Sequence, residues 1–287
     1  MLSTDSAKAL AAGSPFDKTR VELFEVLFDA IKDRYFILRN NRNTDEESFR
    51  LFSFFETYFS NYIEGTEFDV EEAKAIVDSG IPMPRRDEDS HDILGTFKIL
   101  SNRAEMMKIT TSPDELFSIL SHRHSVLLEG RPHMNPGIFK TKNNRAGMTE
   151  FVDYRLVKGT LWQGFKYYAA LTDPFARAIF MMFMISEVHP FNDGNGRIAR
   201  VMMNAELVRA DQSRIIVPTV FREDYILALR KLTRHKDPLA YINVMTKLHQ
   251  FSDNLYGTDF MELKNYLAAC NAYEEPSQAK LQIIDRS

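Results

Sequence analysis

The sequence has 287 residues, enough for one sizeable domain or for a domain with an appendage, and its 44% hydrophobic and 12% aromatic content indicates a globular protein with a full core. A net charge of −4 gives no general attraction to nucleic acid or to an anionic membrane, so neither is expected as a partner. The single cysteine, Cys270, excludes an intrachain disulfide and a cysteine-based zinc site, and it favours a reducing, cytoplasmic location. The N-terminus lacks the pattern of a signal peptide, and no apolar run reaches the roughly 18 residues that span a bilayer.

Helical patterns fill the first part of the chain. Apolar residues at helical spacing predict helices over 17–34, 44–64 and 69–80. Thr44 and Glu47 are expected to form a capping box at the start of the second helix, which should end at Gly65. Residues 1–15 are small and polar and are expected to be frayed. The proline-rich, charged stretch 81–89 is the expected boundary between these helices and the rest of the chain.

The middle of the chain adds a β-hairpin to the helices. Further helices are expected over 89–109, 112–130 and 157–171. Residues 137–141 and 150–157 flank the polar turn 142–147, and this arrangement predicts a hairpin. The three histidines between residues 122 and 133 are poorly spaced for a metal site, so most of them are interpreted as surface or capping residues.

The C-terminal part is again helical. Helices are expected over 174–187, from near Gly194 to Val208, over 223–235, over 237–250 and from Asp259 onward. Residues 213–218 form a short extended run, and the tail from Glu274 is polar. The patterns together predict a mostly α-helical fold with one β-hairpin.

The segment 189–200 reads His-Pro-Phe-Asn-Asp-Gly-Asn-Gly-Arg-Ile-Ala-Arg and joins two apolar helices. Pro190 and the glycines cannot continue the first helix, so the chain turns before the second one begins. The N-terminus of that second helix presents unpaired amides and the positive end of its dipole, which suit an anion. Because Gly194 and Gly196 have no side chains, phosphate oxygens can approach the backbone closely.

Four side chains of this segment add reactive groups. Arg197 and Arg200 lie about one helical turn apart and suit a polyphosphate. Asp193 suits Mg²⁺, which shares its ligands with phosphate oxygens, and His189, with a usual pKa of about 6.5, suits proton removal near neutral pH. Each residue alone is more commonly a cap, a turn or a solvated surface residue. Together they indicate a centre for phosphoryl or nucleotidyl transfer.

The same segment matches, without a gap, the signature of the Fic family, His-Pro-Phe-x-(Asp/Glu)-Gly-Asn-Gly-Arg-x-x-Arg. The resemblance implies a Fic helical bundle with one hairpin and a protein adenylyltransferase, which moves AMP from ATP to a Ser, Thr or Tyr hydroxyl of a protein. It also implies three parts of the chain: N-terminal helices over 1–85, a catalytic core over 86–255, and a C-terminal helix and tail over 256–287.

The resemblance assigns roles within the signature. His189 would take the hydroxyl proton, and Asp193 would hold Mg²⁺ between the phosphates of ATP. The phosphates would be bound by Gly194, Asn195, Gly196, Arg197 and Arg200, with Arg200 at the γ-phosphate.

A second match precedes the signature. Ser60-Asn-Tyr-Ile-Glu64-Gly65 is similar to the family's inhibitory helix, (Ser/Thr)-x-x-x-Glu-(Gly/Asn). Ser60 and Glu64 share a helix face, and a carboxylate in the last turn is mildly unfavourable with the helix dipole, although it could be an ordinary surface residue. The resemblance implies that Glu64 pairs with Arg200 and blocks the γ-phosphate.

In the family, a hairpin flap lies over the active site and holds the target segment by strand addition. The resemblance places Thr149, Glu150 and Phe151 at the middle of this flap, where an edge strand would offer unpaired amides and carbonyls. The sequence departs from the family pattern at Lys140, where many relatives have Arg, and it lacks the proline often found after the second strand.

Two other functions remain open. The first is the reverse reaction, removal of AMP from a modified protein, with Glu64 orienting a water molecule. The second is a non-catalytic module that only senses ATP, against which His189 argues because binding needs no base. The expected partners are ATP, Mg²⁺ and an unidentified target protein, and a homodimer is compatible with the sequence.

Overall fold

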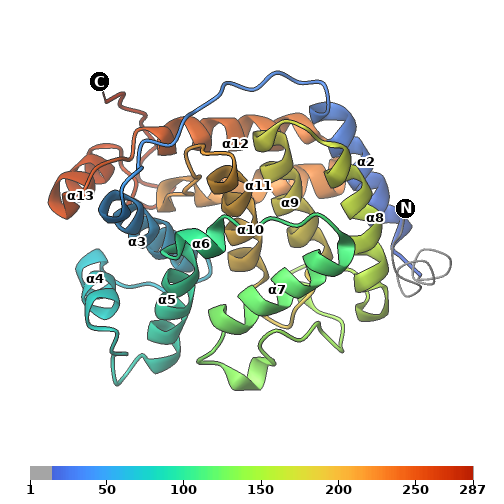
Figure 1. Cartoon of the computed structure of the whole chain (residues 1–287), viewed down its shortest axis with the longest axis horizontal. Coiled ribbons are helices and arrows are strands. Elements are labelled where there is room, and N and C mark those ends of the chain that lie inside the picture. The colour runs from blue at the N-terminus through green and yellow to red at the C-terminus, as the bar shows by residue number, and fades with distance from the viewer. Residues whose placement is uncertain (1–14, 287) are drawn as a thin grey trace.

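The computed structural model describes residues 15–286, which form α-helices and one small β-hairpin (Figure 1). The α-helices are α2 (Lys18–Ile31), α3 (Glu46–Ile63), α4 (Val70–Ser79), α5 (Asp87–Leu100), α6 (Arg103–Met106), α7 (Pro113–Leu127), α8 (Val157–Ala170), α9 (Pro174–Val188), α10 (Asn195–Arg209), α11 (Arg222–His235), α12 (Pro238–Asp253) and α13 (Phe260–Ala269). The hairpin pairs β1 (Arg145–Ala146) with β2 (Thr149–Glu150), and 3-10 helices cover Pro132–Met134, Tyr154–Leu156 and Thr219–Phe221. The expected helical fold with one hairpin is confirmed, whereas the expected fraying of residues 1–15 concerns positions that, apart from Pro15, lie outside the described residues.

The helices α9 and α10 lie at the centre of the fold and share its most extensive helix-to-helix contact (Figure 1). α9 is apolar around nearly its whole circumference, so it needs partners on every side. α2 and α8 pack against α9, whereas α3, α5, α6 and α7 pack against α10. None of the helices within residues 15–286 is both long and apolar enough to span a lipid bilayer. The apolar character of α9 is therefore explained by burial in the core.

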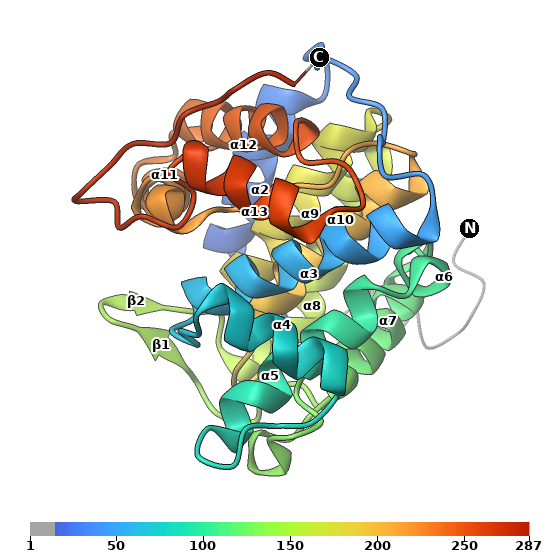
Figure 2. The ribbon, with the colours of Figure 1, turned by 90° about the vertical axis from the view of Figure 1, so that its left-hand side faces the viewer.

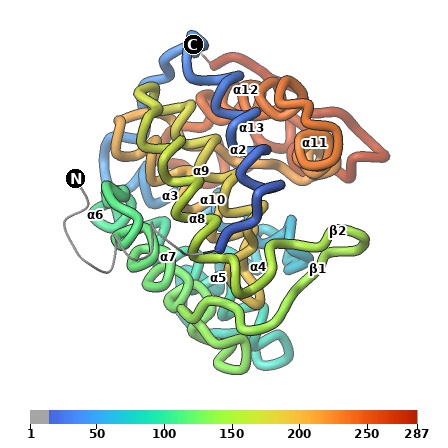
Figure 3. The backbone as a smooth tube through the Cα atoms, turned by 90° about the vertical axis from the view of Figure 1, so that its right-hand side faces the viewer, coloured from blue at the N-terminus to red at the C-terminus, as the bar shows by residue number. Residues whose placement is uncertain are grey.

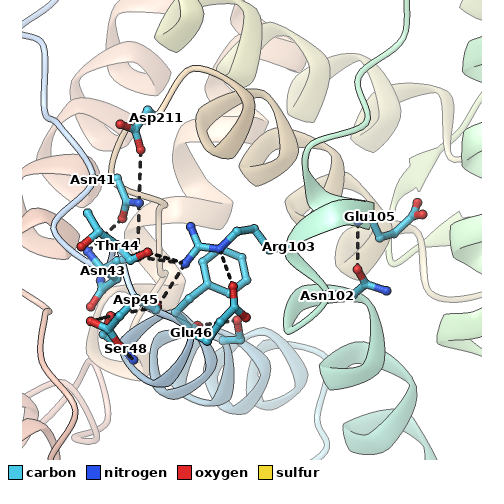
Figure 4. Close-up of polar contacts among 12 residues, drawn as sticks. Asn41, Asn43, Thr44, Asp45, Glu46, Ser48, Asn102, Arg103, Glu105 and Asp211 are labelled. Carbon is cyan, nitrogen blue, oxygen red and sulfur yellow. Dashed lines mark hydrogen bonds and ion pairs between the residues drawn. The ribbon is translucent and has the colours of Figure 1, made fainter.

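The N-terminus of α3 is fixed by a polar network (Figure 4). Asp45 is its N-cap, and the Asp45 carboxylate accepts the main-chain N–H of Ser48 at 2.8 Å. Arg103 from α6 donates to the main-chain carbonyls of Thr44 and Asp45, each at 3.1 Å. The capping box expected at Thr44 and Glu47 is therefore wrong by one residue, because the carboxylate of Asp45 is the better-placed acceptor.

One expected helix is divided in two. α5 ends at Leu100, and the Asn102 side chain then caps the short α6 by accepting the N–H of Glu105 at 3.0 Å. An asparagine side chain competes for main-chain hydrogen bonds, so it favours a cap over a helix interior. The single helix expected over 89–109 is therefore wrong.

The hairpin is shorter than expected, and its turn lies at residues 147–148 instead of 142–147. Residues 137–141, the expected first strand, lie alongside the loop that comes after α9. There the N–H of Lys140 donates to the carbonyl of Pro190 at 2.8 Å. The ring of Phe139 packs on that of Phe191, with centroids 5.2 Å apart. Because these contacts occupy the expected strand, only the residues around the turn form the hairpin, which projects from the body near α11 in Figure 2.

A buried ion pair joins α3 to the segment after α10. The Arg214 guanidinium donates to the Glu56 carboxylate at 2.9 Å, and both side chains are almost fully buried. The second Glu56 oxygen accepts the amide of Asn204, on α10, at 2.7 Å. This network fixes the position of α3 relative to α10. Ser60 lies on the last turn of α3, and Glu64 directly follows the helix.

Replacing Arg214 with Met should lower the free energy of unfolding by about 3–5 kcal/mol, because the buried Glu56 carboxylate loses its counter-charge. Chemical denaturation monitored by circular dichroism measures the change. Arg209→Met, at an exposed position of the same charge, is the matched control and should change stability by less than about 0.5 kcal/mol. Equal stability of the two variants would show that the ion pair does not hold α3 in place.

Candidate active site

The loop between α9 and α10 is held by its own side chains. His189 ends α9 in the left-handed conformation, with φ of 52°, and Gly194 precedes α10 with φ of 69°. The buried Asn195 side chain accepts the N–H of Phe191 at 2.8 Å and donates to its carbonyl at 2.9 Å. Both polar atoms of the Asn195 side chain are thus used in hydrogen bonds within the loop. The main-chain N–H of Asn195 remains available to a ligand, because Asn195 is the first residue of α10.

His124 supports the same loop from α7. Its Nδ1 accepts the N–H of Gly137 at 2.8 Å, so its Nε2 carries the proton and donates to the carbonyl of Asp193 at 2.9 Å. The ring is fully buried and stacks on Phe191 at 3.7 Å. Burial lowers the pKa of His124 to about 4, so the ring stays neutral. His124 is therefore an exception among the three histidines, most of which were expected at the surface or at caps, because sequence spacing could not show that α7 packs over the loop.

His189 has one ring nitrogen engaged and the other available. Its Nδ1 donates to the carbonyl of Ser186 at 3.1 Å, which leaves Nε2 as the unprotonated acceptor. The ring of Phe151, from the hairpin, lies parallel to the imidazole with centroids 3.5 Å apart. Burial of the imidazole, to which this ring contributes, is the main reason that the pKa of His189 falls to about 4. His189 is therefore neutral and able to accept a proton throughout the neutral pH range.

Ser60, Glu64 and Arg200 form one cluster. The Arg200 guanidinium donates to the Glu64 carboxylate at 2.6 Å, to the Ser60 hydroxyl at 2.9 Å and to the Ser60 carbonyl at 2.8 Å. The Arg200 side chain is 5% exposed, whereas that of Glu64 is 33% exposed. Burial alone would raise the pKa of the Glu64 carboxyl, but the charge and the hydrogen bond of Arg200, together with the charge of Arg197, outweigh this effect and lower it. Glu64 is thus an ionised carboxylate placed beside the start of α10.

Gly196 provides the closest approach to that carboxylate. A Cβ at this position would lie 2.2 Å from Oε1 of Glu64 and 3.2 Å from Nη1 of Arg200. The glycine therefore leaves a space that an anionic oxygen occupies, at the N-terminus of a helix. In this structure the anionic oxygen belongs to Glu64.

Arg197 is held by a residue that the sequence did not single out. The Asp92 carboxylate, on α5, lies 2.7 Å from Nη1 of Arg197 and also accepts two hydrogen bonds from Arg131, at 3.0 and 2.7 Å. The Asn61 side chain accepts a second contact from Arg197, at 3.3 Å. Asp92 is nearly fully buried, so it orients Arg197 and balances its charge. Its only signal in the sequence was an acidic residue inside an otherwise ordinary amphipathic helix.

Asp193 is the carboxylate of the loop that faces partly toward solvent, with 39% of its side chain exposed. One oxygen accepts the N–H of Gly194 at 2.7 Å, and the other lies 3.8 Å from Arg197. No cluster of three or more potential ligands forms a metal site of its own among the described residues. A single half-exposed carboxylate does fit Mg²⁺, which keeps waters and takes phosphate oxygens as its remaining ligands. The buried Nε of Arg197, which has no hydrogen-bond partner among the described residues, likewise fits an anion at this place.

Part of this site lines a cavity of about 220 Å³, whose lining residues do not include Asp193, Gly194, Asn195 or Arg197. Glu64, His189, Gly196 and Arg200 form one side of it, and the hairpin covers it with Thr149 and Phe151. Residues of α11 complete the wall: Tyr225, Ile226, Leu229, Arg230 and Thr233. A larger open hollow of about 700 Å³ lies between α7 and the start of α8 and contains none of the predicted site residues. The apolar wall from α11 was not recognised in the sequence, because nothing in a helical pattern shows which face meets a loop 30 residues away.

The hairpin residues take different positions around the cavity. Phe151 covers His189, Thr149 lines the cavity, and Glu150 is exposed. Lys140 is buried at the base of the hairpin, where its ammonium donates to the Asn144 side chain at 2.7 Å. Burial lowers the pKa of Lys140 to about 8. The Asn144 amide in turn donates to the carbonyl of Phe191 at 2.8 Å, so the hairpin and the loop are joined directly.

The titration of His189 tests the stacking by Phe151. Because burial lowers its pKa, His189 should titrate near pH 4 in an NMR experiment, and Phe151→Ala should move the titration upward toward the usual value of about 6.5. The folded state binds fewer protons than the unfolded state between these values, so the His189 contribution to stability is complete above about pH 6.5 and falls as the pH approaches 4. Met148→Ala, at an exposed position of the same hairpin, should leave the titration unchanged. A pKa of 6.5 for His189 in the unsubstituted protein would contradict the burial of its ring.

Comparison with known proteins places this site in a family. The sequence model of the Fic/DOC family matches residues 116–207, from α7 to α10. The chain is 25% identical over 214 residues to the protein adenylyltransferase Fic of Nematostella vectensis, covering 69% of this chain and 47% of that protein. It is 27% identical over 184 residues to the protein adenylyltransferase fic-1 of Caenorhabditis elegans, covering 61% of this chain and 36% of that protein. The chain therefore spans about half, or less, of the length of these curated relatives.

Solved structures give the same result for the fold. A Fic-1 fragment from C. elegans superimposes with a TM-score of 0.59 at 18% identity, covering 88% of this chain and 72% of the fragment. A Fic domain containing signaling protein from Bacteroides thetaiotaomicron superimposes with a TM-score of 0.56 at 17% identity, covering 93% of this chain and all of that one. The family model over residues 116–207 includes the signature at residues 189–200, so the chain contains a domain of the Fic/DOC family.

Proposed function

We propose that this protein transfers AMP from ATP to a Ser, Thr or Tyr hydroxyl of a protein target, and that Glu64 restrains the reaction. The observation that carries the proposal is the cavity in which a neutral histidine, an arginine-bound carboxylate and a helix N-terminus meet. The names of the curated relatives, which are protein adenylyltransferases, support the same reaction.

In the proposed reaction, His189 takes the proton of the target hydroxyl through Nε2. The hydroxyl oxygen attacks the α-phosphorus of ATP, the bond from that phosphorus to the bridging oxygen breaks, and diphosphate leaves. The Nδ1 bond to Ser186 keeps the ring in the tautomer that can accept this proton. Because the low pKa keeps His189 unprotonated, the base is available without a prior proton loss.

The phosphates of ATP would be bound at the start of α10. The main-chain amides of Asn195, Gly196 and Arg197 lack intrahelical acceptors there, and the helix dipole favours negative charge. Arg197 and Arg200 add two guanidiniums, and Arg200 would hold the γ-phosphate. Asp193 would hold Mg²⁺, which supplies charge neutralisation between neighbouring phosphates when it is bound.

Inhibition follows from competition for Arg200. The Glu64 carboxylate accepts a hydrogen bond from the Arg200 guanidinium and fills the space beside Gly196. The γ-phosphate would need both this guanidinium and this space. A carboxylate and a phosphate oxygen cannot both take this place without strong repulsion in a site of low dielectric constant. The wild-type protein is therefore expected to be weakly active until Glu64 is moved, and Ser60 would keep Arg200 in position.

We propose that the three parts of the chain have different roles. Residues 1–85 supply the inhibitory end of α3, residues 86–255 supply the reacting groups, and residues 256–287 cover the core with α13 and the tail. One hydrophobic core includes residues from all three parts, from Leu23 to Leu281. We therefore propose parts that differ in role and fold together.

The position of Glu64 favours one alternative, removal of AMP from a modified protein. Glu64 and His189 line the same cavity, so the carboxylate could orient a water molecule for attack on the phosphorus of the modified residue. Incubating the purified protein with an AMP-modified acceptor, and separately with ATP, distinguishes the two directions. An ATP-sensing module without catalysis would show binding but neither reaction.

His189→Ala should reduce AMP transfer by about 10²–10⁴-fold, because it removes the acceptor of the hydroxyl proton. The substitution is best placed in a Glu64→Gly protein, where activity is expected to be high enough to measure. Affinity for Mg²⁺-ATP, measured by calorimetry, should change little, since His189 contacts no phosphate in the proposed mechanism. Transfer at the level of the parent would remove His189 from the mechanism.

Glu64→Gly should raise self-modification with labelled ATP well above wild type, because the γ-phosphate gains Arg200 and the space beside Gly196. Adding Arg200→Ala should remove most of this gain. Glu67→Gly, which removes an exposed carboxylate three residues away, is the control and should remain at the wild-type level. The inhibitory role of Glu64 is wrong if Glu64→Gly and Glu67→Gly label equally in the presence of a competent target.

A further inference from the structure

We propose that Arg20, on α2, is a positioning residue that fixes the hairpin edge on which the target segment docks. The proposal rests on the function proposed above, in which the hairpin holds the target. The Arg20 guanidinium donates through Nη2 to the main-chain carbonyl of Glu150 at 2.6 Å, across 130 positions of sequence. Its Nε lies 3.3 Å from a carboxylate oxygen of Glu187. One side chain therefore connects α2, α9 and β2.

The carbonyl that Arg20 contacts belongs to the open edge of the hairpin. The N–H of Phe151 donates to the carbonyl of Asn144 at 3.3 Å, and Glu150 is opposite Arg145. Main-chain groups alternate between the two edges of an antiparallel strand, so the N–H and C=O of Glu150 point away from β1. Within β2, Glu150 is thus the residue whose main-chain groups an added strand would pair with.

Arg20 supports this edge without closing it. A two-stranded hairpin this short is not stable alone, so its position depends on contacts to the body. A carbonyl oxygen has two lone pairs, and Arg20 uses one of them, which leaves the second lone pair and the N–H of Glu150 for a target strand. Figure 3 shows the hairpin extending from the body. Thr149, the other residue of β2, is also held, because Arg234 on α11 donates to its hydroxyl at 3.1 Å.

Glu187 keeps Arg20 in place. It is nearly buried on the last turn of α9, two residues before His189, and it also accepts a hydrogen bond from the Thr233 hydroxyl. If Arg20 moved away, a buried carboxylate would lose its cation, which is unfavourable. Glu187 and His189 lie together at the end of α9. Because Arg20 contacts both Glu187 and the carbonyl of Glu150, it fixes the distance between the docking edge and the proposed base. The α2 helix lies outside residues 116–207, so the family model does not include this contact.

The first test measures the hairpin itself and does not depend on activity. In the full chain, Arg20→Met and Glu187→Gln should each raise hydrogen exchange at the main-chain amides of residues 149–151, with exchange in α10 unchanged. Arg20→Lys should give an intermediate result, because a lysine keeps the charge but cannot reach both partners at once. Lys18→Met, at an exposed position of the same helix, is the matched control and should exchange like the parent. Unchanged exchange at the hairpin in Arg20→Met would overturn the proposal.

The second test measures docking. A Glu64→Gly enzyme is given a tagged His189→Ala copy of this chain as the acceptor, and AMP transfer to that copy is followed at increasing acceptor concentration. Arg20→Met in the enzyme should raise the KM for the acceptor about tenfold or more, with the affinity for Mg²⁺-ATP within about twofold of the parent. A lower KM would show that Arg20 blocks the edge and would overturn the proposal, as would an equal loss of ATP affinity. If no AMP transfer occurs in any variant, the proposed function fails, while the exchange experiment still decides the role of Arg20.

Discussion

The structure around α10 depends on one electrostatic constraint: two arginines are buried at the N-terminus of a helix, where positive charge already accumulates. Arg197 and Arg200 have almost no exposed surface, so each needs an anionic partner from the rest of the chain. Asp92, on α5, forms the ion pair with Arg197. Glu64, at the end of α3, forms the ion pair with Arg200. The packing of α3 and α5 against α10 thus has an electrostatic as well as an apolar cause.

The two partners differ in burial, and the inhibitory role proposed for Glu64 depends on this difference. Asp92 is 2% exposed and also binds Arg131, so it cannot leave without loss of the surrounding contacts. Glu64 follows the last turn of α3, one-third of its side chain is exposed, and it has Gly65 beside it. A triphosphate would supply the charge that Arg200 needs and would release Glu64 at little cost to the fold. A pair that an incoming ligand can replace is suited to regulation.

The opposite side of the cavity is organised by apolar and main-chain contacts. Phe151 covers His189, while Lys140 and Asn144 join the hairpin to the loop after α9. Burial keeps His189 neutral, and the ring of Phe151 contributes to that burial, so the hairpin affects the protonation state of the proposed base as well as covering the cavity.

The sequence by itself determined the helical fold, most helix boundaries, and the groups that meet at the start of α10, because these depend on local spacing, caps and glycine positions. It also placed Ser60 and Glu64 on one helix face, although only the resemblance to a family linked them to Arg200. The tertiary structure decided what depends on distant packing: the partner Asp92, the supporting role of His124, the wall from α11 and the contact of Arg20 with Glu150. It also shortened the hairpin, since residues 137–141 bind the loop after α9 instead of a second strand. Such contacts join residues up to 130 positions apart, and no local pattern encodes which helix face will meet which loop.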